Sequence, residues 1–326
     1  MLRFIKNIWN PEVFHQNNKM VYFEGWYFKN VSAKHNNSLA IIPGIFRSND
    51  NSYAFIQILD GNSKESHFLK FDYEDFEYSL DKFDIRIGKN FFNLDFIKLD
   101  IERDNYRIFG QLNFKNHHPW EIERFSPGAM GWYGFVPFME CNHAVLSFNN
   151  QVSGKVLVNN NIYIFTKDKG YIEKDWGKSF PSSYIWMQSN SFTDPDLSLF
   201  LSIAKIPWLG NSFTGFIVGF YTKDKFYKFA TYTGAKILKL KVENDFFDII
   251  IQDKNNVIEI KAKRNIGGEL NAPYSGSMAK RINESMNSSI SIILSNRTKN
   301  SKRIIIEDET NLAGIEFVGK IEELLK

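Results

Sequence analysis

The chain has 326 residues, which is long enough for two ordinary domains or one large β architecture with a sizeable core. Its 40 lysines and arginines against 37 aspartates and glutamates give a net charge of +3, too small to indicate a nucleic acid or another polyanion as partner. The single cysteine, Cys141, excludes an intramolecular disulfide, so nothing points to an oxidising compartment.

The sequence also lacks targeting and membrane-spanning signals. The first ten residues contain no apolar run of signal-peptide length. No stretch approaches the roughly 20 apolar residues that cross a bilayer. We therefore expect a soluble, cytoplasmic protein, membrane-peripheral only through transient contact with a membrane surface while it collects a ligand.

Alternation of apolar and polar residues is the dominant pattern along the chain, and it predicts strands separated by turns rich in Asn, Asp and Gly. Only two short helices are expected, one starting at Asn10-Pro11 and one over residues 321–326. The sequence thus predicts an all-β fold built from hairpins, as a sandwich or barrel. In chain order, strands are expected at residues 52–60, 83–87, 91–96, 99–102, 106–109, 155–158, 162–165, 216–221, 246–252 and 257–260.

A weak internal repeat suggests two related halves. The segment at residues 22–26 is similar to that at 171–176, residues 110–113 to 268–271, and residues 128–130 to 276–278. The order of the matches is kept and the offsets are similar. We expect an N-terminal β half over 1–145 and a C-terminal β half over 146–326.

The common cofactor motifs are missing. There is no glycine-rich phosphate loop, no dinucleotide fingerprint and no Gly-x-Ser-x-Gly elbow. None of the histidines has a metal-ligand spacing, so neither a metal nor a cofactor is expected. The thiol of Cys141 lies in no motif and is expected to be buried and inert. The six histidines are His15, His35, His67, His117, His118 and His143.

Aromatic residues are abundant, with 31 Phe, 14 Tyr and 7 Trp, and they indicate either a bulky β core or an aromatic-lined cavity. Residues 22–30, 131–143 and 171–190 mix these aromatics with carboxylates, Gly and Pro. A carboxylate beside buried aromatics is costly unless it is paired, protonated or used in chemistry. Two interpretations remain open. In the first, the carboxylates accept backbone N–H groups or pair with a cation, the candidate cations being Lys29, Lys174, Lys178 and Arg124. In the second, one carboxylate is an acid whose pKa is raised in an apolar pocket.

These segments resemble the tocopherol cyclase family. The motif Phe-Glu-Gly-Trp-Tyr-Phe stands at residues 23–28, and Pro137-Phe-Met-Glu140 is similar to the family's Pro-Phe-Leu-Glu. Residues 173–181, Glu-Lys-Asp-Trp-Gly-Lys-Ser-Phe-Pro, are similar to Glu-Lys-Asn-Trp-Gly-x-x-Phe-Pro. Residues 186–192 and 270–273 are similar to Trp-Val-Gln-x-Asn-x-Phe and Leu-x-Ala-Pro. The matches keep their order from about residue 20 to 320.

The resemblance implies a fold of two lipocalin-like antiparallel β halves and a hydrophobic ligand of the prenylquinol type. It implies a reaction in which an acid protonates an alkene and the phenolic oxygen attacks the cation to close a chromanol ring, without cofactor or metal. The catalytic candidates are Glu173, Asp175, Glu140 and His143, with a carboxylate as the acid and the histidine as the base. The ligand-binding candidates are Glu24, Trp26, Trp132, Tyr133, Trp176, Tyr184, Trp186, Gln188 and Asn190.

One position departs from the family pattern. The family follows Pro-Phe-Leu-Glu with Pro-His-Trp, whereas Cys141-Asn142-His143 stands here, so the histidine comes one residue later. A one-residue β-bulge would restore its direction. Two alternatives to a cyclase stay open: a non-catalytic lipocalin-like carrier, which needs the cavity but not the acid, and a glycan-binding sandwich that uses exposed aromatic rings.

Overall fold

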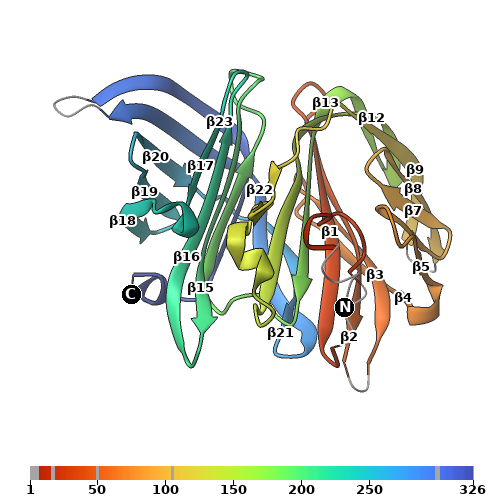
Figure 1. The fold of residues 1–326 in the computed structure, drawn as a ribbon. Helices are drawn as coiled ribbons and strands as arrows, with labels where there is room; N and C mark the ends of the chain where they lie inside the picture. Colours follow the sequence, from red (N-terminus) through yellow and green to blue (C-terminus); the bar gives the residue numbers. More distant parts are fainter. Residues whose placement is uncertain (1–6, 16–18, 49–50, 104–105, 298–301, 326) are drawn as a thin grey trace. The chain divides into compact units, whose positions relative to one another are not determined.

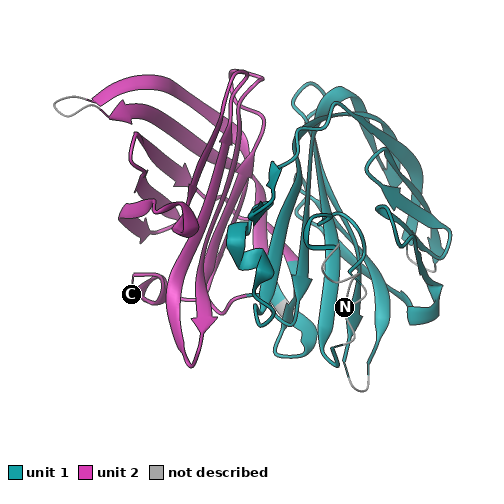
Figure 2. Cartoon of the chain, in the orientation of Figure 1, with its two compact units in different colours: residues 1–180, 270–281 teal, residues 181–269, 282–326 magenta. Residues whose placement is uncertain are grey.

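The computed structural model describes residues 7–15, 19–48, 51–103, 106–297 and 302–325. The chain divides into two compact units, the first made of residues 1–180 with 270–281 and the second of 181–269 with 282–326 (Figure 2). The expected division after residue 145 falls inside strand β12 (Cys141–Val158). Because β12 pairs along its length with β13 (Asn161–Gly177), both strands belong to the first unit.

The first unit is an antiparallel sheet that curls around its own core (Figure 1). Its strand order over the described residues is β4-β3-β2-β1-β13-β12-β9-β8-β7-β6-β5. The remaining bounds are β1 Tyr22–Ser32, β2 Asn37–Arg47, β3 Tyr53–Asp60, β4 Ser66–Asp72, β5 Phe76–Tyr78, β6 Asp84–Ile87, β7 Asn90–Asn93, β8 Phe96–Arg103 and β9 Tyr106–Lys115, with β10 Ile122–Glu123 and β11 Ser126–Pro127 forming a small separate hairpin.

Aromatic contacts inside this unit show how far the sheet curls. The ring of Trp26, on β1, stacks on that of Phe83 at 5.1 Å, although Phe83 precedes β6 near the far edge of the sheet. Phe28 stacks on Phe114 at 5.6 Å. Both β1 residues are fully buried. The alternating apolar side chains therefore meet across an enclosed core, which is how a barrel-like sheet buries one face.

The second unit repeats this design with the order β17-β16-β15-β14-β23-β22-β20-β19-β18. Strand β21, which pairs with β22, lies mostly in the first unit, as does the start of β22 up to residue 281. The core of the second unit contains Ile185, Met187, Leu201 and Val218 among many others. The bounds are β14 Tyr184–Ser189, β15 Ser198–Trp208, β16 Asn211–Tyr221, β17 Phe226–Ala230, β18 Lys236–Glu243, β19 Phe246–Gln252, β20 Asn256–Lys263, β21 Gly268–Tyr274, β22 Ser277–Arg297 and β23 Lys302–Val318.

The all-β prediction is confirmed, and each predicted strand lies in or overlaps an observed one. The predicted helix at Asn10-Pro11 is wrong: the chain makes a turn there, because the carbonyls of Pro11 and Val13 accept hydrogen bonds from the distant Lys174 ammonium. At the C-terminal end only one 3-10 turn forms, and Lys326 lies outside the described residues. The 3-10 turns are η1 Tyr73–Asp75, η2 Gly131–Phe135, η3 Thr231–Thr233 and η4 Ile321–Glu323.

The strongest match of the internal repeat has a different meaning from the one expected. Residues 22–26 lie on β1 and residues 171–176 on β13, and these strands pair with each other in the first unit. Residues 276–278 also belong to the first unit. These similar segments therefore do not relate one unit to the other.

Two neighbouring glycines on the first sheet face the ring of Phe55. A Cβ added to Gly44 would lie 2.6 Å from both the Phe55 ring and the Glu24 carbonyl oxygen, whereas one added to Gly25 would find its nearest neighbour at 3.7 Å. We expect Gly44→Ala to lower the free energy of unfolding by about 1–3 kcal/mol, as overpacking typically does. Urea denaturation measures this, with Gly25→Ala as the matched control. Equal stability of the two variants would contradict the close packing of Phe55.

Candidate catalytic site on the first sheet

Strand β13 carries the motif Glu173-Lys174-Asp175-Trp176, and the pleat sends alternate side chains to opposite faces of the sheet. In the antiparallel register, Asp175 stands opposite Gly25 of β1 and His143 of β12. Glu173 and Asp175 therefore lie with His143 on one face, which we call the outer face. Lys174 and Trp176 lie on the core face.

The outer-face residues form a chain of polar contacts. The Nδ1 atom of His143 is 2.8 Å from Oδ1 of Asp175, and its Nε2 is 3.6 Å from Oε2 of Glu173. The hydroxyl of Tyr171 donates a hydrogen bond of 2.5 Å to the same Glu173 oxygen. The imidazole thus lies between two carboxylates, and a phenol closes one end. We call Tyr171, Glu173, His143 and Asp175 the relay.

Burial and the neighbouring charges shift the pKa of His143 in opposite directions. Burial alone would lower the pKa of His143, but the carboxylates of Asp175 and Glu173 outweigh it and raise the pKa. Burial, with Glu173 beside it, raises the pKa of the Tyr171 phenol well above its usual range. At neutral pH, these directions favour a protonated imidazole and a neutral phenol. Such a group holds one mobile proton between two carboxylates.

An apolar cluster adjoins the relay on the same face. Phe23, Phe55 and Met278 belong to it, and Cys141 packs against it. The sulfur of Cys141 is also 3.9 Å from Oδ1 of Asp175, so this side chain connects the cluster to the relay. Cys141 is partly buried, where the sequence predicted a buried thiol. Burial and the nearby carboxylates of Asp175 and Glu140 raise the pKa of this thiol well above its usual range, which disfavours the reactive thiolate.

The core face holds a second, separate polar cluster. The ammonium of Lys174 lies 2.5 Å from Oε1 of Glu24, and both side chains are fully buried. Tyr22 donates to Oε2 of the same carboxylate at 2.5 Å. The ammonium also lies 4.8 Å from the Trp26 ring and 4.9 Å from the Trp176 ring. Glu24, Trp26 and Trp176 are thus brought together, but on the side of the sheet away from the relay.

The burial of this pair makes it important for stability. Burial raises the pKa of Glu24 and lowers that of Lys174, while the pairing of the two groups opposes both shifts. Lys174 also donates to two backbone carbonyls, those of Pro11 and Val13. It therefore fastens the N-terminal segment to the barrel core. Glu24 thus follows the first of the two interpretations that the sequence left open, in which the carboxylate pairs with a cation.

Replacing Lys174 by Met would leave the Glu24 carboxylate buried without its cation. We expect Lys174→Met to lower the free energy of unfolding by about 3–5 kcal/mol, the usual cost of breaking a buried pair. Adding Glu24→Gln should recover part of the loss, because the uncompensated charge is then gone. Denaturant titration measures both, with the exposed Lys82→Met as control. A single variant as stable as the control would show that the pair does not stabilise the fold.

The relay residues also have a spacing that suits a metal ion. Among the residues that the structure describes, His143, Glu173 and Asp175 offer donor atoms within 4.8 Å of one another. Nδ1 of His143, however, is already engaged by Asp175 at 2.8 Å, and its other nitrogen faces Glu173. An ion would have to break this arrangement to gather all three donors. The geometry therefore fits proton transfer better than metal binding.

The other predicted site residues lie elsewhere. Glu140 precedes β12, and its backbone carbonyl accepts hydrogen bonds from the amides of Lys178 and Ser179. Trp132 and Tyr133 lie on η2, where their rings stack at 4.0 Å. The last group belongs to the second unit: Tyr184, Trp186 and Gln188 are alternate residues of β14 on the face away from that unit's core, and Asn190 follows the strand.

The sequence motifs named Lys174 as a possible partner of a carboxylate, but they did not single out Tyr171 in the first unit. They also missed Glu316 in the second unit, where Tyr184 donates to its carboxylate at 2.7 Å. A usable signal for Tyr171 was present. In a strand, residues two apart share a face, so Tyr-x-Glu at 171–173 predicts a contact between phenol and carboxylate, and 22–24 does the same. Glu316 carries no such local signal, because its partner is 132 residues away.

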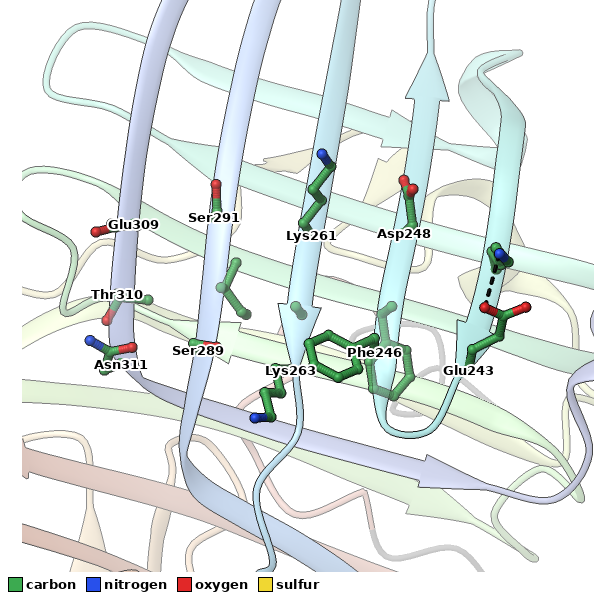
Figure 3. Close-up of a pocket in the computed structure, with 14 residues that line it drawn as sticks. Glu243, Phe246, Asp248, Lys261, Lys263, Ser289, Ser291, Glu309, Thr310 and Asn311 are labelled. Carbon is green, nitrogen blue, oxygen red and sulfur yellow. Dashed lines mark ion pairs between the residues drawn. The ribbon is translucent and has the colours of Figure 1, made fainter.

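A surface hollow of about 480 Å³ lies on the second unit, and none of the predicted site residues lines it (Figure 3). Six of the fourteen residues that line it are charged. Lys241 contacts Glu243 at 2.9 Å, and Lys263 lies over the Phe246 ring at 5.2 Å. This hollow does not provide the apolar enclosure expected for a prenylquinol.

Comparison with known proteins agrees with the sequence motifs. A family model described as tocopherol cyclase-like matches residues 111–319, and the chain belongs to this family. A probable chloroplastic tocopherol cyclase of Oryza sativa subsp. japonica is 25% identical over 159 residues, which cover 47% of this chain and 33% of the relative. The chloroplastic tocopherol cyclase of Zea mays is 22% identical over 147 residues, covering 44% and 31%. The matches thus span about a third of the length of these relatives.

Solved structures share the fold at low sequence identity. A putative AttH from Nitrosomonas europaea aligns with a TM-score of 0.50 and 10% identity, covering 91% of this chain and 92% of that one. CghA in complex with Sch210972 aligns with a TM-score of 0.55 and 8% identity, covering 92% and 89%. The expected fold of two lipocalin-like β halves is confirmed. No helix in the described part of the chain is long and apolar enough to span a membrane.

Proposed function

We propose that the chain binds a hydrophobic small molecule of the prenylquinol type on the outer face of the first sheet and closes it to a chromanol by proton transfer. One observation carries the proposal: the relay and the apolar cluster lie on the same face, joined through Cys141. A prenyl chain needs apolar contacts, and protonation of its alkene needs an acid beside them. Family membership supports the choice of reaction. We place this activity in the cytoplasm or at a membrane surface.

The relay has the groups for both proton transfers. His143 passes its proton to Glu173, and Glu173 gives this proton to the alkene. The phenolic oxygen of the ligand then attacks the tertiary cation, a C–O bond forms, and the phenol proton goes to the now neutral His143. No atom is gained or lost overall. The His143–Glu173 distance of 3.6 Å must shorten for this transfer, as catalytic contacts commonly do when a ligand binds.

Glu173 is the first residue to test. We expect Glu173→Gln to reduce the cyclisation rate of a prenylated hydroquinone by about 10²–10⁴-fold, because a general acid typically contributes this much. The affinity for the hydroquinone, measured by quenching of tryptophan fluorescence, should change little. Glu243→Gln, an exposed change on the second unit, is the control. A rate within tenfold of the wild type would show that Glu173 is not the acid. Binding without product in either protein would favour the carrier alternative.

The pH dependence tests the role of His143 separately. The mechanism needs the protonated imidazole, whose pKa is raised above its ordinary value of 6.5. The value of kcat/KM should therefore hold at low pH and fall as the pH rises through that pKa. Asp175→Asn removes one of the two carboxylates that raise it, so the fall should move to lower pH. A fall at the same pH in both proteins would mean that another group controls the rate.

A further inference from the structure

We propose that residues 125–139, which we call the aromatic segment, form a surface that enters the interfacial layer of a lipid bilayer. The segment is Phe-Ser-Pro-Gly-Ala-Met-Gly-Trp-Tyr-Gly-Phe-Val-Pro-Phe-Met, and it contains no charged residue and no histidine. In the whole chain 24% of residues are charged. The idea that the ligand comes from the bilayer rests on the proposed function. Insertion of the aromatic segment into the bilayer does not depend on that function.

Large apolar side chains of the segment face solvent. Phe125 is 75% exposed, Phe138 50%, Trp132 45% and Phe135 37%. Scattered single exposures are ordinary, but four aromatic rings within fourteen residues are unusual for a surface that meets only water. Met20, which is 69% exposed, lies near them, since the neighbouring Lys19 donates to the carbonyl of Pro137.

The segment is held in place while its rings stay exposed. The small hairpin β10–β11 and the turn η2 give it regular structure. The ring of Trp9 packs on Phe135 at 5.5 Å and donates through Nε1 to the carbonyl of Arg124. An ordered surface loses little conformational entropy on binding, which favours insertion of the rings.

The charges around the segment identify the kind of membrane. Two cations border it: Lys19 donates to the carbonyl of Pro137, and the Arg124 guanidinium lies 5.4 Å from the Phe125 ring. Glu121, Glu123 and Glu140 flank it in the sequence. The border is therefore not positive overall, and attraction to anionic lipid is not the driving force. Trp, Tyr and Phe without net positive charge suit the interface of a zwitterionic bilayer, where apolar contacts supply the affinity.

The segment also leads directly to the relay. It ends at Met139, and His143 follows four residues later on β12. Four residues span at most about 14 Å of extended chain. A ligand taken from the bilayer at this surface would therefore have a short path to the outer face of the sheet.

Vesicle flotation with pure phosphatidylcholine tests the surface on the full chain. The wild type should float with the vesicles, to nearly the same extent at low and high salt. The double variant Phe125→Ser/Phe138→Ser should have a vesicle partition coefficient that is lower by tenfold or more. The matched control is Leu209→Ser/Ile266→Ser, which removes two apolar side chains, each 77% exposed, from the second unit. It should float as the wild type does, and circular dichroism should show the same fold in all three.

Several results would overturn the proposal: no flotation of the wild type, equal loss in the control, or binding only to anionic vesicles. Loss of dimers by the Phe variant in sedimentation velocity, with no vesicle binding, would assign the surface to a second copy instead. A separate assay tests the proposed function. Turnover of a short-chain, water-soluble prenylquinol should be the same in the Phe variant and the wild type. No turnover in either would refute the cyclase while leaving vesicle binding intact.

Discussion

The buried ion pair between Lys174 and Glu24 fixes the register on which the rest of the first unit depends. An ammonium fully inside a barrel is tolerated only with a carboxylate and further acceptors beside it, and this one has all of them. Because side chains alternate along β13, placing Lys174 in the core sends Glu173 and Asp175 to the other face. A slip of one residue would turn two carboxylates into the core and move the lysine to the outer face. The ion pair on the core face therefore determines that the relay lies on the outer face.

The two clusters use the same residue types for different purposes. On the core face, Glu24 meets a lysine and two tryptophan rings, a set that holds a charge in one place. On the outer face, Glu173 meets a histidine and a tyrosine, a set that can pass a proton in the proposed reaction. A permanent cation beside Glu173 would keep it ionised and remove its use as an acid. The separation by the sheet is thus a chemical requirement of the proposed reaction as well as a consequence of the pleat.

Much of the fold followed from local pattern, because period-two alternation is a property of each strand alone. The candidate carboxylates and His143 came from motifs, and the structure brings Glu173, Asp175 and His143 together. The division of the site between two faces depends on the pairing of β1 with β13, strands about 150 residues apart, which no local pattern encodes. The failed helix at Asn10-Pro11 has a similar origin, since its carbonyls accept from a lysine on another strand.

The shifted histidine shows why family membership does not settle the chemistry of this chain. The register between Cys141 and Val145 is regular, with bulges only further along β12, so no bulge turns His143. A histidine one position earlier, where Asn142 stands, would face Trp176 on the core side. The one-residue shift therefore changes which carboxylates the imidazole can meet. The partner of this histidine is decided by its odd or even position along the strand. The proposed proton transfers therefore depend on the register of this chain and not on the family motif alone.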